Sequence, residues 1–205
     1  MIANQFFWPY LAASIVCIAS PGPDSLTVLS LGLARGRREA MQFALGVGSG
    51  CLTHTLWAAL GVAAVVAASQ QLFIAIKLAG AAYLLWLGIS ALLSRGALAA
   101  GRLPSLGAAR AARGGWQRYL NGFVSNSLNP KVMLFFIAFL PQFVDPALGP
   151  VSHQMLQLGA GFALMTATSY VLLGAASGRV GELLRRRPGL ALKLDRRSEE
   201  HTSEL

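Results

Sequence analysis

Charged residues are scarce in this chain: they make up 12% of its 205 residues, and only eight residues are acidic. A soluble domain usually carries about 25% charged residues. Hydrophobic residues make up 55% of the sequence and gather in runs long enough to cross a bilayer, for which about 20 residues suffice. This composition excludes an ordinary soluble domain and indicates an all-α membrane protein.

Cysteine and several functional motifs are also nearly or wholly missing. The two cysteines, Cys17 and Cys51, stand in separate apolar runs, and no CxxC pair occurs. Metal and thiol redox sites need such clusters, so we expect no metal and no other cofactor. The sequence has no GxxxxGK[ST] loop, which excludes an ATPase on this chain. No nucleophile motif lies in the apolar runs either, so we do not expect an enzyme.

Five apolar segments are each long enough to span a membrane, and short polar or Pro/Gly-rich breaks separate them. They cover residues 6–33, 41–67, 72–93, 119–144 and 152–176. Each segment is apolar on every face, whereas a surface helix of a soluble protein has a polar side. The sequence therefore predicts a polytopic membrane helix bundle that forms one domain over residues 1–196.

Basic residues follow alternate segments. Three follow the first segment, five lie between the third and the fourth, and seven follow the fifth, together 15 of the 17. The positive-inside rule assigns these connections to the cytoplasm and the N-terminus to the outside of a bacterial inner membrane. Because topology accounts for the net charge of +9, we expect no nucleic acid as a partner.

The first segment is interrupted near its middle by Pro21, Gly22 and Pro23, and Asp24 follows directly. The prolines remove backbone donors and disfavour helix in the residues before them. Lipid tolerates such a break where it faces protein or a wet cavity. Asp24 is the only acidic residue deep in a predicted span, which indicates a functional site. We expect these four residues to bind substrate and Asp24 to carry the coupled proton; alternatively, Asp24 only caps the second half-helix.

A second break lies in the fourth segment, at Asn126, Asn129, Pro130 and Lys131. Asn129 can cap a helix that Pro130 opens at its first position. Lys131 then stands beside a helix N-terminus, where its charge and the helix dipole both attract an anion such as a carboxylate. We predict that these four residues bind substrate. The alternative is that Lys131 extends to the cytoplasmic interface.

Polar residues elsewhere in the segments are weaker candidates. His54 is a candidate proton relay, since imidazole titrates near neutral pH, and hydrogen-bonded packing is the alternative. Lys77 and Tyr83 are candidate substrate contacts, although extension to the outer interface explains Lys77 about as well. Gly46 and Gly50 form a GxxxG pattern that permits close helix approach and says little about function.

The two breaks suggest an internal repeat. They fall in the first and fourth segments, so an odd number of spans separates them and the two halves are inverted, as in many secondary transporters. This 3+3 plan requires a sixth span, and five are present. Residues 197–205 are abruptly polar and resemble a translated sequencing-adapter read, so we expect this tail to be non-native.

A missing sixth helix has consequences that a structure can check. We expect it to leave Gly159, Gly161 and Gly174 exposed to lipid, with fewer packing partners than their counterparts in the first half, and to leave an unfilled groove beside the fourth and fifth segments.

Taken together, the motifs resemble the lysine-exporter family of amino-acid efflux proteins, including its homoserine/threonine-resistance branch. The resemblance covers about residues 5–196 and rests on ordered elements at 21–24, 35–36, 46–50, 77–88 and 122–131. It implies six spans, export of amino acids or their derivatives driven by the proton motive force, and a homodimer. The chain departs from the family near residue 196, where members usually continue into an apolar span. The alternative is a non-transport membrane role in redox chemistry, metal handling or structure.

Overall fold

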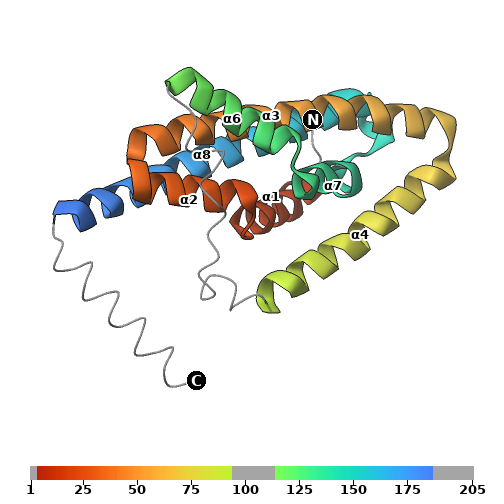
Figure 1. The fold of residues 1–205 in the computed structure, drawn as a ribbon. Coiled ribbons are helices and arrows are strands. Elements are labelled where there is room, and N and C mark those ends of the chain that lie inside the picture. The colour runs from red at the N-terminus through yellow and green to blue at the C-terminus, as the bar shows by residue number, and fades with distance from the viewer. Residues whose placement is uncertain (1–3, 94–113, 187–205) are drawn as a thin grey trace.

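A computed structural model of the protein describes residues 4–93 and 114–186, which form helices joined by short turns (Figure 1). In chain order the elements are α1 (Asn4–Ala19), α2 (Pro23–Arg35), α3 (Arg37–Ala68), α4 (Gln70–Leu93), α6 (Gly115–Ser127), α7 (Pro130–Ala138), the 3₁₀ helices η1 (Leu140–Phe143) and η2 (Pro146–Leu148), and α8 (Val151–Arg186). No strand occurs in these two ranges, and the predicted all-α class is confirmed. The polar tail at 197–205 lies outside the described residues.

The predicted spans coincide with these helices, but two of the spans are bent. The first corresponds to α1 and α2, which are bent by 55°, and the fourth to α6 and α7, which are bent by 52°. Helices α3 and α8 are long and apolar enough to cross a membrane unbroken, which gives up to four spans among the described residues. Helix α4 coincides with the predicted third span; that it crosses the membrane stays a prediction.

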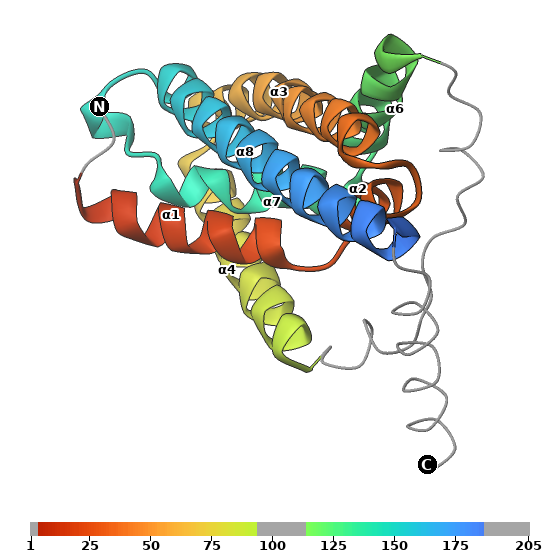
Figure 2. The same ribbon diagram turned by 90° about the vertical axis from the view of Figure 1, so that its left-hand side faces the viewer.

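Helices α3 and α8 form the centre of the bundle and run side by side, with α2 and α6 packed against them (Figure 1, Figure 2). Glycines allow these backbones to approach closely. A Cβ atom at Gly46 would collide with the Tyr119 carbonyl of α6, and one at Gly50 would lie 2.8 Å from the Phe123 carbonyl. The close approach predicted from the GxxxG pattern is therefore confirmed.

The glycines of α8 do not behave as expected. A Cβ atom on Gly159 would collide with Thr55, and one on Gly174 would lie 3.0 Å from Ala40, so both glycines face α3. The expectation that they are exposed to lipid is wrong, because α3 runs along α8 and buries both. A groove of about 670 Å³ does exist, but it lies between α8 and the first bent pair rather than beside the second.

Helix α4 leaves the end of α3 and runs away from the centre of the bundle (Figure 1). It packs mainly against α7 and α3, and a Cβ atom on Gly80 would collide with the Ala138 carbonyl at the end of α7. Large apolar side chains such as Leu78, Leu85 and Trp86 are exposed on it. Such a surface suits lipid, because acyl chains are as apolar as these side chains.

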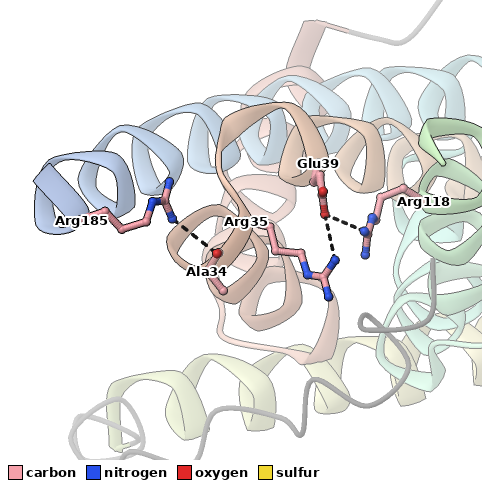
Figure 3. A network of polar contacts seen from close by, with 5 residues as sticks. All are labelled: Ala34, Arg35, Glu39, Arg118 and Arg185. Carbon is pink, nitrogen blue, oxygen red and sulfur yellow. Dashed lines mark hydrogen bonds and ion pairs between the residues drawn. The ribbon is translucent and has the colours of Figure 1, made fainter. Parts of the chain in front are cut away.

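Basic residues from three of the predicted connections gather at one end of the bundle (Figure 3). Arg185 of α8 donates to the carbonyls of Leu33 at 3.2 Å and Ala34 at 3.4 Å. Arg118 of α6 forms an ion pair with Glu39 of α3 at 2.6 Å. One membrane face rich in arginine is what the positive-inside rule requires. That this face is cytoplasmic stays a prediction.

Candidate functional site

The first helix break is built from residues that cannot continue a helix. Pro21 and Pro23 have no N–H group, and Gly22 adopts an extended backbone (φ −157°, ψ 175°) as the N-cap of α2. Ser25 completes this cap, since its hydroxyl accepts the Gly22 N–H at 3.0 Å and donates to the Gly22 carbonyl at 3.1 Å. The alternative in which Asp24 caps α2 is therefore wrong.

Asp24 lies in the first turn of α2 and is only 2% exposed. Its carboxylate accepts three hydrogen bonds from side chains of the second break: Ser125 Oγ at 2.6 Å, Asn126 Nδ2 at 2.9 Å and Asn129 Nδ2 at 2.8 Å. An ionised carboxylate can only accept hydrogen bonds, and all three partners donate. The second break thus supplies the polar surroundings without which a buried charge is very costly.

Asn129 connects the two breaks through one amide. Its Oδ1 accepts the backbone N–H of Lys131 at 3.0 Å, and Pro130 occupies the first position of α7, so the predicted N-cap is confirmed. The other end of the same amide donates to Asp24. The residue that starts α7 therefore also fixes the carboxylate at the start of α2.

Lys131 points from the second break back toward the first. Its Nζ donates to the carbonyl of Ser20 at 2.6 Å, and its side chain is partly exposed. Ser20 has one of the carbonyls that the break after α1 frees from helical bonding. The contacts are therefore reciprocal, since Asp24 reaches the end of α6 and Lys131 the end of α1. The Lys131 ammonium thus bonds to the first break; where it lies relative to the membrane interface stays a prediction.

His54 lies in α3, directly behind the second break, and is 5% exposed. Its Nε2 lies 2.8 Å from the carbonyl oxygen of Asn126, and its ring packs near Phe136 with centroids 5.8 Å apart. Because a carbonyl only accepts, Nε2 carries the hydrogen of this bond. The alternative of hydrogen-bonded packing is confirmed, and a role of His54 in proton relay stays a prediction.

A cavity of about 20 Å³, enough for about one water molecule, lies between the breaks. Of the predicted site residues, five line it: Gly22, Asp24, Asn126, Asn129 and Lys131. Pro21, Pro23 and Pro130 shape the breaks and are exposed. Lys77 and Tyr83 belong to α4, and their side chains lie outside the described part of the chain, so their contacts stay predictions.

The wall opposite the breaks belongs to α8 and was not predicted. Phe162, Thr166 and Tyr170 line the cavity from this helix, and Cys17, Ile18 and Val132 complete the lining. Residues four apart share one face of a helix, so the spacing of these three side chains was a usable signal. The described residues contain no group of three or more His, Cys, Asp or Glu side chains placed to hold a metal ion.

Comparison with known proteins gives consistent matches over most of the chain. The LysE type translocator family matches residues 15–192. An uncharacterised membrane protein of Pseudomonas aeruginosa is 37% identical over 186 residues, which cover 90% of this chain and 85% of the relative. A threonine efflux protein of Salmonella typhi is 31% identical over 79% of this chain and 75% of its own. A leucine efflux protein of an Enterobacter species is 34% identical over 68% of this chain and 64% of its own. No solved structure matches.

Proposed function

Because this chain belongs to the LysE type translocator family, we propose that it exports amino acids across the bacterial inner membrane. It is a transporter and not an enzyme. The relatives named for efflux of threonine and leucine support an amino-acid substrate. One observation carries the proposal: two helix breaks meet inside the bundle, and each presents one charged side chain, Asp24 and Lys131, of opposite sign.

These two charges complement the backbone of an amino acid, which carries an ammonium and a carboxylate group on one carbon. In the proposed complex, Lys131 and the N-terminus of α7 hold the substrate carboxylate, and Lys131 gives up the Ser20 carbonyl to do so. A carboxylate adds the attraction of opposite charges, which the bond from the same ammonium to the neutral Ser20 carbonyl lacks. Asp24 carries the substrate ammonium or the coupled proton.

Proton coupling also centres on Asp24 in this proposal. The ionised carboxylate accepts from Ser125, Asn126 and Asn129 and so ties α2 to the second bent pair. A protonated carboxyl group is neutral, and hydrogen bonds to an ionised acceptor are about twice as strong as those between neutral groups. Protonation therefore weakens the tie, and a ligand that changes the relative stability of two conformations shifts their populations. We propose proton antiport on this basis.

Two further expectations belong to the same proposal. The end that carries Arg118 and Arg185 faces the cytoplasm, which leaves the N-terminus outside. The functional unit is a homodimer, as the family resemblance implies.

The test uses inside-out membrane vesicles that contain the protein, so that export appears as uptake into the lumen. With an acidic lumen, we expect labelled leucine or threonine to accumulate above its outside concentration, and a protonophore to abolish the accumulation. Equilibration without accumulation would reject proton coupling and keep transport. No uptake above that of vesicles lacking the protein, for any of the 20 amino acids, would reject the proposed function.

A further inference from the structure

The groove between α8 and the first bent pair differs chemically from the site at the breaks. Its volume is about 670 Å³, and it is lined from α1, α2 and α8. Most of its wall is aliphatic, with Leu11 and Ile15 on one side and Leu164 and Leu173 on the other. None of its lining residues is charged. A charged group placed there would lack a counter-ion, which is costly at membrane depth.

The groove and the cavity at the breaks share a boundary. Ile18 and Tyr170 line both spaces. The Tyr170 hydroxyl donates to the Ile18 carbonyl at 3.4 Å, a length at which a hydrogen bond is weak. The Ile18 carbonyl lacks its helical donor, because the Gly22 N–H four residues on donates to Ser25 instead. Ile18 and Tyr170 therefore lie at the boundary between the two spaces.

The sizes of the two spaces indicate how they are used. The cavity has room for about one water molecule, so a whole amino acid cannot fit there without more space. The groove supplies this space directly beyond Ile18 and Tyr170, while Asp24 and Lys131 remain on the cavity side. We propose that the transported amino acid has an uncharged, mainly apolar side chain, and that this side chain lies in the groove while its ammonium and carboxylate groups stay between the breaks. This inference rests on the proposed function.

The first experiment measures uptake of single amino acids by unmodified protein in inside-out vesicles. We expect the specificity constant for leucine to exceed those for lysine and glutamate by about a hundredfold or more, because the groove offers no counter-ion. A specificity constant for lysine or glutamate equal to that for leucine would overturn this inference and leave amino-acid export intact. Failure to transport any amino acid would overturn the inference together with the proposed function.

The second experiment narrows the groove. Leu173 lines it, whereas the neighbouring Leu172 is 65% exposed and does not. We expect Leu173→Trp to raise the KM for leucine about tenfold, the scale on which an apolar pocket discriminates, with the KM for glycine within about twofold. The matched control Leu172→Trp should leave both constants unchanged.

A second variant, on the opposite wall of the groove, keeps the test valid if Leu173→Trp does not fold. Ile15→Trp enters the groove from α1 and should show the same selective loss for leucine over glycine. If both folded variants transport leucine with native KM, the groove is filled by lipid only, and the inference is wrong. An equal rise in the KM for leucine and for glycine in both variants would overturn the inference as well. Such a result would mean that narrowing the groove does not act on the substrate side chain.

Discussion

The two bent spans are built alike but hold their charged residues differently. They bend by 55° and 52°, and each restarts with a proline at the first helical position and a charged residue at the second. Asp24 is 2% exposed and accepts three side-chain hydrogen bonds. Lys131 is partly exposed and bonds through its ammonium to one described acceptor, the Ser20 carbonyl.

This difference assigns different duties to the two charges. Moving Asp24 breaks three bonds between the bent spans, so Asp24 acts as the fixed point of the site. Moving Lys131 breaks one bond to a neutral carbonyl, and a substrate carboxylate restores it in stronger form. Asp24, the fixed charge, should therefore control whether transport occurs. Lys131, the exchangeable charge, should control how tightly substrate binds.

The largest effect is expected from Asp24→Asn, which keeps the shape and removes the charge and the titration. The new amide can turn its oxygen to Asn126 and Asn129 and its nitrogen to the Ser125 hydroxyl, which also accepts. We expect gradient-driven leucine accumulation to fall by at least about a hundredfold, equivalent to about 3 kcal/mol, with insertion into the membrane maintained. Accumulation is measured in vesicles at matched protein levels.

A matched control is Asp145→Asn. Asp145 is partly exposed before η2, and its Oδ1 accepts the Ala147 N–H at 2.9 Å, a role that asparagine can retain. Vesicles that contain the Asp145→Asn variant should accumulate leucine at the native rate. Native accumulation by Asp24→Asn would show that Asp24 neither couples protons nor holds the ammonium group.

The next effect is expected from Lys131→Gln, which should weaken binding without abolishing transport. Loss of a charged hydrogen bond to the substrate carboxylate costs about 1.5–3 kcal/mol, so the KM for leucine should rise by about ten- to a hundredfold. Competition by isoamylamine, which has the leucine side chain but no carboxylate, should not weaken. An unchanged KM for leucine would mean that Lys131 does not recognise the substrate carboxylate.

A smaller effect is expected at His54, which supports the Asn126 carbonyl that lies beside the fixed charge. His54→Gln retains a side-chain donor and should transport at close to the native rate. His54→Leu leaves the carbonyl without this donor, at a cost of about 1 kcal/mol, or about fivefold in rate. The initial uptake rates of both variants are compared. If both variants lose proton-driven accumulation of leucine but still let leucine equilibrate across the membrane, then His54 relays protons and does not merely position Asn126.

Local features of the two breaks could be predicted from the sequence, and their partners could not. Proline removes helical donors and asparagine caps helices wherever they occur, so the breaks and the Asn129 cap followed from a few adjacent residues. Asp24 stood out because a deep carboxylate in lipid is rare. Its donors, such as Ser125, lie about a hundred positions away, and no short-range pattern relates them to Asp24.

The contacts of α8 were missed for a related reason. The sequence predicted that Gly159 and Gly174 are exposed to lipid, whereas both are buried against α3. Which two helices become neighbours depends on how the bent spans fold back, and this is a long-range property. The wall at Phe162, Thr166 and Tyr170 has helical spacing, but spacing alone does not say what a face meets.

The smallest effect on transport is expected at the arginine-rich end of the bundle, where an ion-pair network also joins the two halves (Figure 3). Arg118 of α6 is 3% exposed and pairs with Glu39 of α3 at 2.6 Å, whereas Arg35 lies 3.8 Å from the same carboxylate and is 33% exposed. Arg118 precedes Asn126 by eight residues, or about 12 Å along the helix, so the pair is remote from the site. Removing one member of a fully buried pair costs about 3–5 kcal/mol, but Glu39 is 35% exposed and solvent screens it.

We therefore expect Arg118→Met to lower the free energy of unfolding by about 1–2 kcal/mol, and the matched variant Arg35→Met by at most about 0.5 kcal/mol. Thermal unfolding in detergent measures both, and leucine uptake should keep its native KM in both. A changed KM in Arg118→Met would mean that this end also controls the site, and the contrast between a fixed and an exchangeable charge would no longer suffice to explain transport.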